Sequence, residues 1–317
     1  MVKFSAGLNE RSEGMLIANA RVLRGGTILP GADVLVEGGR IAAIGKDLKG
    51  PKKIDARGAL LAPGFVDLHI HGCRGDDTMD GGDAVHRMAE WLPGTGVTGF
   101  LPTTMCDSLE NTREALSGVK RAMEAPGGAA VLGCHLEGPF LNAARKGAQP
   151  ERFVKAPSLD AYARIVEGYE ALPRILTIAP EVEGATELIE ILKDNLALSA
   201  GHTDATAEQF LAAVDAGLTQ ATHLFNAMSP FNHREPGATG AALADARIRV
   251  QLIADLTHLH PVALTVAWRA KGAANCLLVT DSMAATGMPD GDYRLGANLV
   301  QVRCGVARLT NGALAGS

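Results

Sequence analysis

The pattern of apolar and polar positions changes twice along the 317 residues of the chain. Residues 15–62 hold short apolar runs separated by glycine-rich turns, which is typical of β-strands without helices. From residue 63, continuous apolar runs alternate with amphipathic helical stretches, and short alternating runs return after Asp281. We therefore predict an α/β fold in three segments. They are 1–62, the first part of a small β-sandwich domain; 63–291, a (β/α)8 TIM-like barrel; and 292–317, an incomplete β segment that returns to the small domain.

The prediction of a barrel rests on eight apolar runs in the middle segment. Continuously apolar strands that alternate with helices indicate a parallel sheet covered on its faces, and eight of them favour a closed barrel over an open sheet. The expected strands are 64–70, 97–103, 129–137, 174–180, 196–202, 219–225, 249–255 and 275–281, and the expected helices include 108–125, 159–169, 185–195, 207–216 and 261–271.

The eighth run lacks the helix that normally follows it, because no amphipathic stretch appears between Asp281 and Ser317. One flank of the barrel would then lack its helical cover. We therefore expect the 317 residues to be a C-terminally truncated form that is less stable than a longer one.

Composition narrows the classes of function. Hydrophobic residues make up 47% of the chain and aromatic residues only 4%, so the core must consist mainly of aliphatic side chains. The net charge of −5, without blocks of like charge, argues against a nucleic-acid partner, and no apolar stretch is long enough to span a membrane. Five scattered cysteines without a CxxC pair indicate a reduced, cytoplasmic protein. Any metal site must therefore use histidines and carboxylates.

The first candidate for chemistry is the run PGFVDLHIHG at 63–72, which ends in His69 and His71. Residues i and i+2 of a strand point the same way, so both imidazoles should point into the barrel at the carboxyl end of its first strand. Active sites of barrel enzymes lie at that end. A metal site explains such a pair better than two structural histidines.

Other strands carry the same residue types near their carboxyl ends: Glu137 in the third, His202 in the fifth, His223 in the sixth and Asp281 in the eighth. Imidazoles and carboxylates in such numbers suit zinc, iron or manganese. His135 also points inward but lies deeper, so we expect it to support the ligands and not to bind metal.

The motifs that carry these residues resemble the amidohydrolase superfamily, and within it the N-acetylglucosamine-6-phosphate deacetylases. The resemblance spans essentially the whole chain. It rests on PGFVDLHIHG (63–72), HLEGPF (135–140), SAGHTDA (199–205), THLFNAMSPFNHREPG (222–237), LIADLTHLHP (252–261) and TDSMAATG (280–287).

The resemblance implies roles for the candidate residues. Glu137, His202 and His223 would bind the principal metal, and Asp281 would be the general base that acts on water. His69 and His71 would allow a second metal, with Glu137 as the bridge between the two ions.

The resemblance also implies a phosphorylated amino sugar as the substrate. The backbone at Asn226 and Ala227, together with His258 and Arg234, would contact the sugar or its phosphate. Arg234 would do so across a homodimer. Two departures concern the pocket: Gln149 stands where some members have a histidine, and Leu256 where members often have glycine.

The expected reaction is hydrolysis of N-acetylglucosamine 6-phosphate to glucosamine 6-phosphate and acetate. Two alternatives stay open at this point. One is another amidohydrolase, such as a deacetylase of N-acylated amino acids or a cyclic amidase. The other is a catalytically silent metal-binding scaffold on the same fold.

Overall fold

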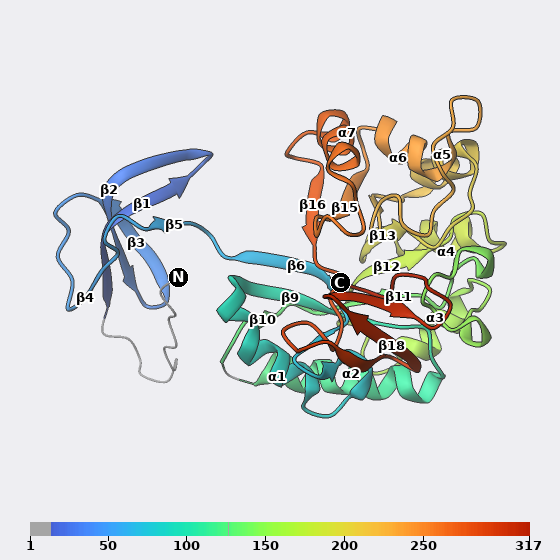
Figure 1. Cartoon of the computed structure of the whole chain (residues 1–317), viewed down its shortest axis with the longest axis horizontal. Helices are drawn as coiled ribbons and strands as arrows, with labels where there is room; N and C mark the ends of the chain where they lie inside the picture. Colours follow the sequence, from blue (N-terminus) through green and yellow to red (C-terminus); the bar gives the residue numbers. More distant parts are fainter. Residues whose placement is uncertain (1–13, 126) are drawn as a thin grey trace. The chain divides into compact units, whose positions relative to one another are not determined.

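The computed structural model describes residues 14–125 and 127–317, and the chain divides into two compact units after Phe65 (Figure 1). The first thirteen residues of the expected small domain lie outside the described residues. Each unit has a core of its own, so we describe the two separately.

The N-terminal unit is a five-stranded sheet in the order β3-β2-β1-β4, with β5 also paired to β1. Alternate residues of β1 are buried, and Ala20 and Val22 pack against Ala32 and Val34 of β2. This period of two explains why the segment forms strands and not helices. The strands are β1 (Met15–Arg24), β2 (Thr27–Glu37), β3 (Arg40–Gly45), β4 (Lys52–Asp55) and β5 (Leu60–Leu61).

The second unit contains the eight parallel strands that the sequence predicts. In spatial order they are β6 (Phe65–Ile70), β9 (Val97–Thr104), β11 (Cys134–Glu137), β12 (Pro173–Ile178), β13 (Ala197–Ala200), β14 (Gln220–Ala221), β15 (Arg249–Ile253) and β16 (Cys276–Val279). The third apolar run divides into a short strand β10 (Ala130–Val131), which pairs with β9, and β11. The TIM-like barrel is confirmed.

Helices follow the strands at the positions that the helical period indicates. They are α1 (Ala84–Trp91), α2 (Leu109–Glu124), α3 (Leu159–Val166), α4 (Ala185–Leu192), α5 (Ala207–Ala216), α6 (Gly237–Ala244) and α7 (Pro261–Lys271). Short elements in the connections are β7 (Gly72–Cys73), β8 (Asp76–Asp77) and the 3-10 turns Thr78–Asp80, Leu92–Thr95, Ala143–Arg145 and Glu151–Phe153. None of the helices described in residues 14–125 and 127–317 is long and apolar enough to cross a membrane.

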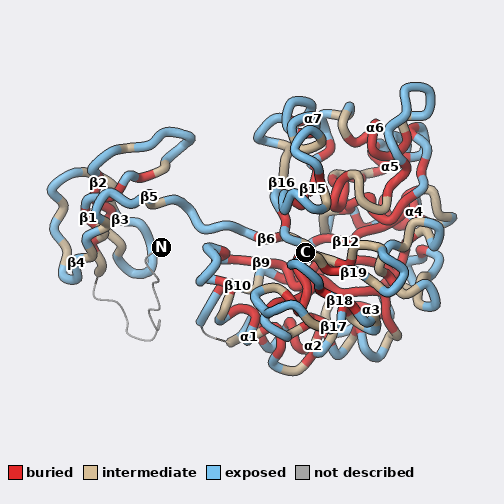
Figure 2. Tube along the Cα trace, viewed as in Figure 1, coloured by how far each residue is buried: buried red, intermediate tan, exposed pale blue. Residues whose placement is uncertain are grey.

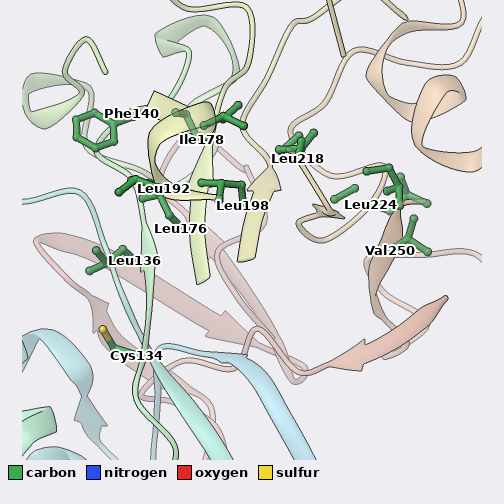
Figure 3. Packing of buried hydrophobic residues seen from close by; sticks show 14 of the residues in the cluster. Cys134, Leu136, Phe140, Leu176, Ile178, Leu192, Leu198, Leu218, Leu224 and Val250 are labelled. Atoms are coloured by element: carbon green, nitrogen blue, oxygen red, sulfur yellow. The ribbon is translucent and has the colours of Figure 1, made fainter. Parts of the chain in front are cut away.

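The main core is an aliphatic layer that strands and helices share. Leu136, Leu176 and Leu198 on neighbouring strands belong to one buried cluster (Figure 3). Leu188 and Phe210 on helices belong to the same cluster. Buried residues follow the barrel strands, whereas exposed residues follow the outer connections (Figure 2). Polar side chains occupy the inward side of the strands.

The first and last strands close the barrel at their carboxyl ends. The Asp281 backbone N–H donates to the His69 carbonyl over 2.8 Å, and the His71 N–H donates to the Ser282 carbonyl over 2.9 Å. These two bonds bring the histidine pair of β6 next to the aspartate that follows β16.

A buried carboxylate strengthens the same seam. Asp67 accepts hydrogen bonds from the Thr280 hydroxyl at 2.6 Å and from the Thr280 and His69 backbone N–H groups, each at 3.2 Å. Burial raises the pKa of Asp67, and the hydrogen bonds from Thr280 and His69 oppose that rise.

The outer flank of β16 is uncovered, as the sequence predicts. No helix follows this strand in the described part of the chain, and Leu278 is 61% exposed. Although the sequence of β16 is apolar, the two faces of this strand are therefore not both buried.

The last strands differ from the expected return to the N-terminal sheet. β17 (Gly291–Leu295), β18 (Asn298–Arg303) and β19 (Val306–Leu309) form an antiparallel sheet of their own, within the compact unit that holds the barrel. The physical reason is an apolar face. Leu295, Val300 and Val302 pack with Met105 and Met283, so that this face is buried against residues that follow β9 and β16.

We predict that Asp67→Ala lowers the free energy of unfolding by about 3 kcal/mol, because it leaves buried N–H and hydroxyl donors without an acceptor. Urea unfolding of the purified variant measures this change. Asp194→Ala removes an exposed carboxylate and is the control. Equal stability of the two variants would mean that Asp67 does not stabilise the seam.

Candidate metal centre and active site

The six ligands that the sequence predicts meet at the carboxyl end of the barrel, around the carboxylate of Glu137. Glu137 Oε1 lies 3.0 Å from His223 Nε2, 3.2 Å from His202 Nε2 and 3.5 Å from His69 Nε2. Glu137 Oε2 lies 3.3 Å from His71 Nε2. The carboxylate is 2% exposed, so solvent cannot screen these contacts.

Five of the six side chains form two overlapping groups of three with atoms close enough to hold a metal ion. One group is Glu137, His202 and His223, and the other is His69, His71 and Glu137. Asp281 joins the second group, because its Oδ1 lies 3.2 Å from His71 Nε2 and 3.4 Å from His69 Nε2. Glu137 belongs to both groups and is therefore the only bridge between them among the described residues.

Backbone carbonyls set the orientation of two imidazoles. His71 Nδ1 lies 3.2 Å from the Thr103 carbonyl oxygen, and His202 Nδ1 lies 2.9 Å from the Arg145 carbonyl oxygen. A carbonyl only accepts, so we assign a proton to Nδ1 of each ring. The Nε2 atoms of both histidines then face the carboxylate cluster.

Such an arrangement of acceptors requires a cation or additional protons. His69 Nε2 lies 3.2 Å from His71 Nε2, and His202 Nε2 lies 3.2 Å from His223 Nε2. Two lone pairs at that distance repel one another unless a positive charge lies between them. Imidazole and carboxylate ligands in a buried site suit a divalent transition metal, so the residues fit the metal that the motifs imply.

The carboxylates of the centre are ionised. Burial would raise the pKa of Glu137, but the charges of His69 and His202 hold it well below its usual range. Burial likewise opposes ionisation of Asp281, yet His69 and the hydrogen bond from His71 lower the pKa of Asp281 to about 2. Both groups therefore supply negative charge around neutral pH.

His135 lies beside the centre without pointing into it. Its Nδ1 is 3.1 Å from the Leu68 carbonyl oxygen and its Nε2 is 2.7 Å from Thr177 Oγ1, while its ring packs against His69 with the centroids 4.6 Å apart. Burial holds the pKa of His135 well below its usual range, so the ring is neutral. This geometry supports the expectation that His135 orients a ligand.

A cavity of about 370 Å³ opens from the centre, and it brings together most of the predicted substrate residues. Its walls include Gln149, Asn226, Ala227 and His258. His258 is held by Asp255, whose Oδ2 lies 2.7 Å from His258 Nδ1. Apolar wall residues are Met105, Leu295 and Leu314.

Gln149 touches the metal centre itself. Its Nε2 donates to Glu137 Oε2 over 2.5 Å, and its Oε1 accepts from the Cys106 backbone N–H over 2.7 Å. The second bond fixes which way the amide points. Gln149 therefore places a donor, and not an imidazole lone pair, at this side of the carboxylate.

Two residues singled out from the sequence do not line this cavity. Arg234 is exposed in the segment between β14 and α6, and Leu256 is 63% exposed in the loop after β15. Within one chain, neither residue meets the metal centre.

Several residues that orient the centre escape prediction from the sequence. Thr103 and Arg145 act through backbone carbonyls, which every residue type possesses. Gln251 and Asp67 are polar residues that interrupt apolar strand runs, and this interruption could have identified both of them from the sequence. Gln251 Oε1 lies 3.3 Å from His69 Nδ1.

Comparison with known proteins shows a family match over most of the chain. Residues 60–302 match the family described as "Amidohydrolase family". The N-acetylglucosamine-6-phosphate deacetylase of Bacillus subtilis (strain 168) is 40% identical over 316 residues, which cover 96% of this chain and 80% of the relative. The N-acetylgalactosamine-6-phosphate deacetylase of Escherichia coli O157:H7 is 38% identical over 271 residues, which cover 84% of this chain and 72% of the relative.

Solved structures give the same result. A mutant N-acetyl-D-glucosamine-6-phosphate deacetylase from Mycobacterium smegmatis, in complex with N-acetyl-D-glucosamine-6-phosphate, superposes with a TM-score of 0.90 at 34% identity. The match covers 96% of this chain and 81% of that one. The N-acetylglucosamine-6-phosphate deacetylase from Thermotoga maritima has a TM-score of 0.84 at 38% identity, with coverage of 95% and 80%.

We predict that Glu137→Gln releases most of the bound metal, because it removes the negative charge that both groups share. Elemental analysis after dialysis should find less than about a tenth of the parental metal content. Glu190→Gln is the matched control, since it makes the same change at an exposed carboxylate and should keep the parental metal content. Parental metal content in Glu137→Gln would contradict the shared role of this carboxylate.

Proposed function

Because the chain belongs to the amidohydrolase family, and within it to the N-acetylglucosamine-6-phosphate deacetylases, we propose that it hydrolyses the N-acetyl amide of a 6-phosphorylated amino sugar. The products are the free amino sugar phosphate and acetate. The observation that carries this proposal is the buried Glu137, which faces four imidazoles beside a cavity with His258 in its wall.

The residues of the centre hold the metal in this proposal. Glu137, His202 and His223 would hold one divalent ion, and His69 and His71 with Glu137 would hold a second. The ions are zinc or iron, with manganese as a further candidate. A metal ion at such a site lowers the pKa of water and polarises the amide carbonyl.

Asp281 acts as the general base and then as the general acid. It is ionised before the reaction, because its pKa is lowered to about 2, so its carboxylate can accept a proton from the attacking water. It then returns this proton to the nitrogen of the departing amine. His69 and His71, both within 3.4 Å of Asp281 Oδ1, hold the carboxylate in place.

Polar residues of the cavity bind the sugar phosphate. The ring of His258 is oriented by Asp255, and the backbone at Asn226 and Ala227 forms the adjoining wall. Arg234 would reach the phosphate of a neighbouring copy in a homodimer, since a guanidinium binds two phosphate oxygens at once.

We place the reaction in the cytoplasm. The five cysteines are free, and three of them are buried, as expected for a protein of a reducing compartment. A phosphorylated sugar substrate agrees with this placement.

An assay with four substrates tests the proposed reaction. The metal-loaded protein should release acetate from N-acetylglucosamine 6-phosphate faster than from N-acetylglucosamine or an N-acetyl amino acid. N-acetylgalactosamine 6-phosphate is the fourth substrate, because one similar relative is named for it. Faster hydrolysis of the amino acid would identify a different amidohydrolase, and no hydrolysis of any substrate would favour a silent scaffold.

We predict that Asp281→Asn lowers kcat by at least about 100-fold, the size of a typical general acid–base contribution. Asparagine keeps the shape of the side chain but cannot take a proton from water. Elemental analysis should still find metal at Glu137, His202 and His223. Turnover near the parental rate would show that another group is the base.

We predict that His258→Asn raises KM for N-acetylglucosamine 6-phosphate by about tenfold or more, because a hydrogen bond to a charged group contributes about 1.5–3 kcal/mol. Arg234→Ala should have a similar effect if a second copy supplies it. The unphosphorylated sugar is the control, and its KM should change little. Equal effects on both sugars would mean that neither residue recognises the phosphate.

A further inference from the structure

The backbone of Asp281 adopts a conformation that a side chain disfavours. Its φ is +53°, in the left-handed region where Cβ crowds the following carbonyl. Such a residue keeps this conformation only where its surroundings impose it. The hydrogen bonds of the Asp281 backbone therefore reveal what positions the carboxylate.

Two backbone hydrogen bonds hold Asp281 from opposite sides. Its N–H donates to the His69 carbonyl of β6, and its carbonyl accepts from the Ser317 N–H, each over 2.8 Å. The first bond belongs to the closure of the barrel. The second comes from residues 315–317, which follow the antiparallel sheet of β17–β19.

Residues 315–317 make further bonds to the same loop. The Ser317 hydroxyl donates to the Thr280 carbonyl over 2.6 Å, and the Ser317 carbonyl accepts from the Thr286 hydroxyl over 2.8 Å and from the Met283 N–H over 3.3 Å. Ala315 is fully buried in the cluster that contains Met105 and Met283. The segment is thus anchored by packing and bonded on both sides of Asp281.

Gly316 lets this segment approach closely. Its φ is +74°, and a Cβ added there would lie 3.0 Å from the Asp281 carbonyl oxygen and 3.1 Å from the Met283 side chain. Gly316 also lines the cavity that opens from the metal centre. A side chain at this position would push the segment and the Asp281 backbone apart.

We propose that residues 315–317 are a positioning element for the general base. They hold the left-handed backbone of Asp281, so that its carboxylate stays against His69 and His71. The effect on catalysis rests on the proposed role of Asp281, whereas the effect on the backbone does not.

The test compares two glycines of the same region. Gly316→Ala and Gly312→Ala both place a side chain at positive φ, +74° and +87°, but an added Cβ meets no atom within 4 Å at Gly312. Gly316→Ala should lower kcat by about tenfold or more, since a misplacement of about 1 Å can cost 100-fold. KM and metal content should stay near the parental values, whereas the melting temperature should fall in both variants, because each carries a side chain at positive φ. Gly312→Ala should leave kcat unchanged.

A second variant and a second readout keep the test independent of other assumptions. Ser317→Ala removes only the hydroxyl bond to Thr280 and should lower kcat less, in the same direction. Hydrogen exchange should become faster at the Asp281 and Met283 amides in Gly316→Ala but not in Gly312→Ala. This readout stays valid even if Asp281→Asn proves active and the base lies elsewhere.

Three results would overturn the proposal. One is parental kcat together with parental exchange at Asp281 in Gly316→Ala. Another is an equal loss of kcat in Gly316→Ala and Gly312→Ala, which would reduce the effect to general backbone strain. Loss of metal in Gly316→Ala would likewise show that the segment supports the ligands and not the base.

Discussion

The structure depends on one electrostatic constraint, the convergence of four imidazoles on the buried carboxylate of Glu137. Acceptor atoms that point at one another in a low dielectric repel strongly. They remain together only because the barrel fixes each side chain from its own strand and because a cation can lie between them. Hydrophobic packing of the outer layer thus supplies the stability that brings these polar groups together.

The fold meets this constraint through hydrogen bonds of its backbone. Carbonyls of Thr103 and Arg145 orient His71 and His202, and the bond from Asp281 to His69 joins the last strand to the first. His202, His223 and Asp281 all have positive φ, at 49°, 31° and 53°. Such strain at three strand ends is typical of functional sites, where the surroundings hold what the residue alone would not adopt.

Much of this arrangement could be predicted from the sequence. The eight strands were evident because parallel barrel strands are apolar throughout, and the six ligands because histidines and carboxylates lie at the carboxyl ends of such runs. The orienting carbonyls could not be predicted, since Thr103 and Arg145 contribute atoms that every residue has. The position of β17–β19 could not be predicted either. Alternating strands indicate that one face is apolar, but they do not indicate which surface covers that face, and here Met105 and Met283 cover it.

The central claim is that a metal bound at Glu137 makes this barrel a deacetylase of a phosphorylated amino sugar. The most direct measurement is acetate release from N-acetylglucosamine 6-phosphate by chelator-treated protein during titration with zinc or iron(II). We expect no hydrolysis without metal, and a rise to a plateau as the two ligand groups fill. Undiminished hydrolysis by metal-free protein, or no hydrolysis after full loading, would contradict the account.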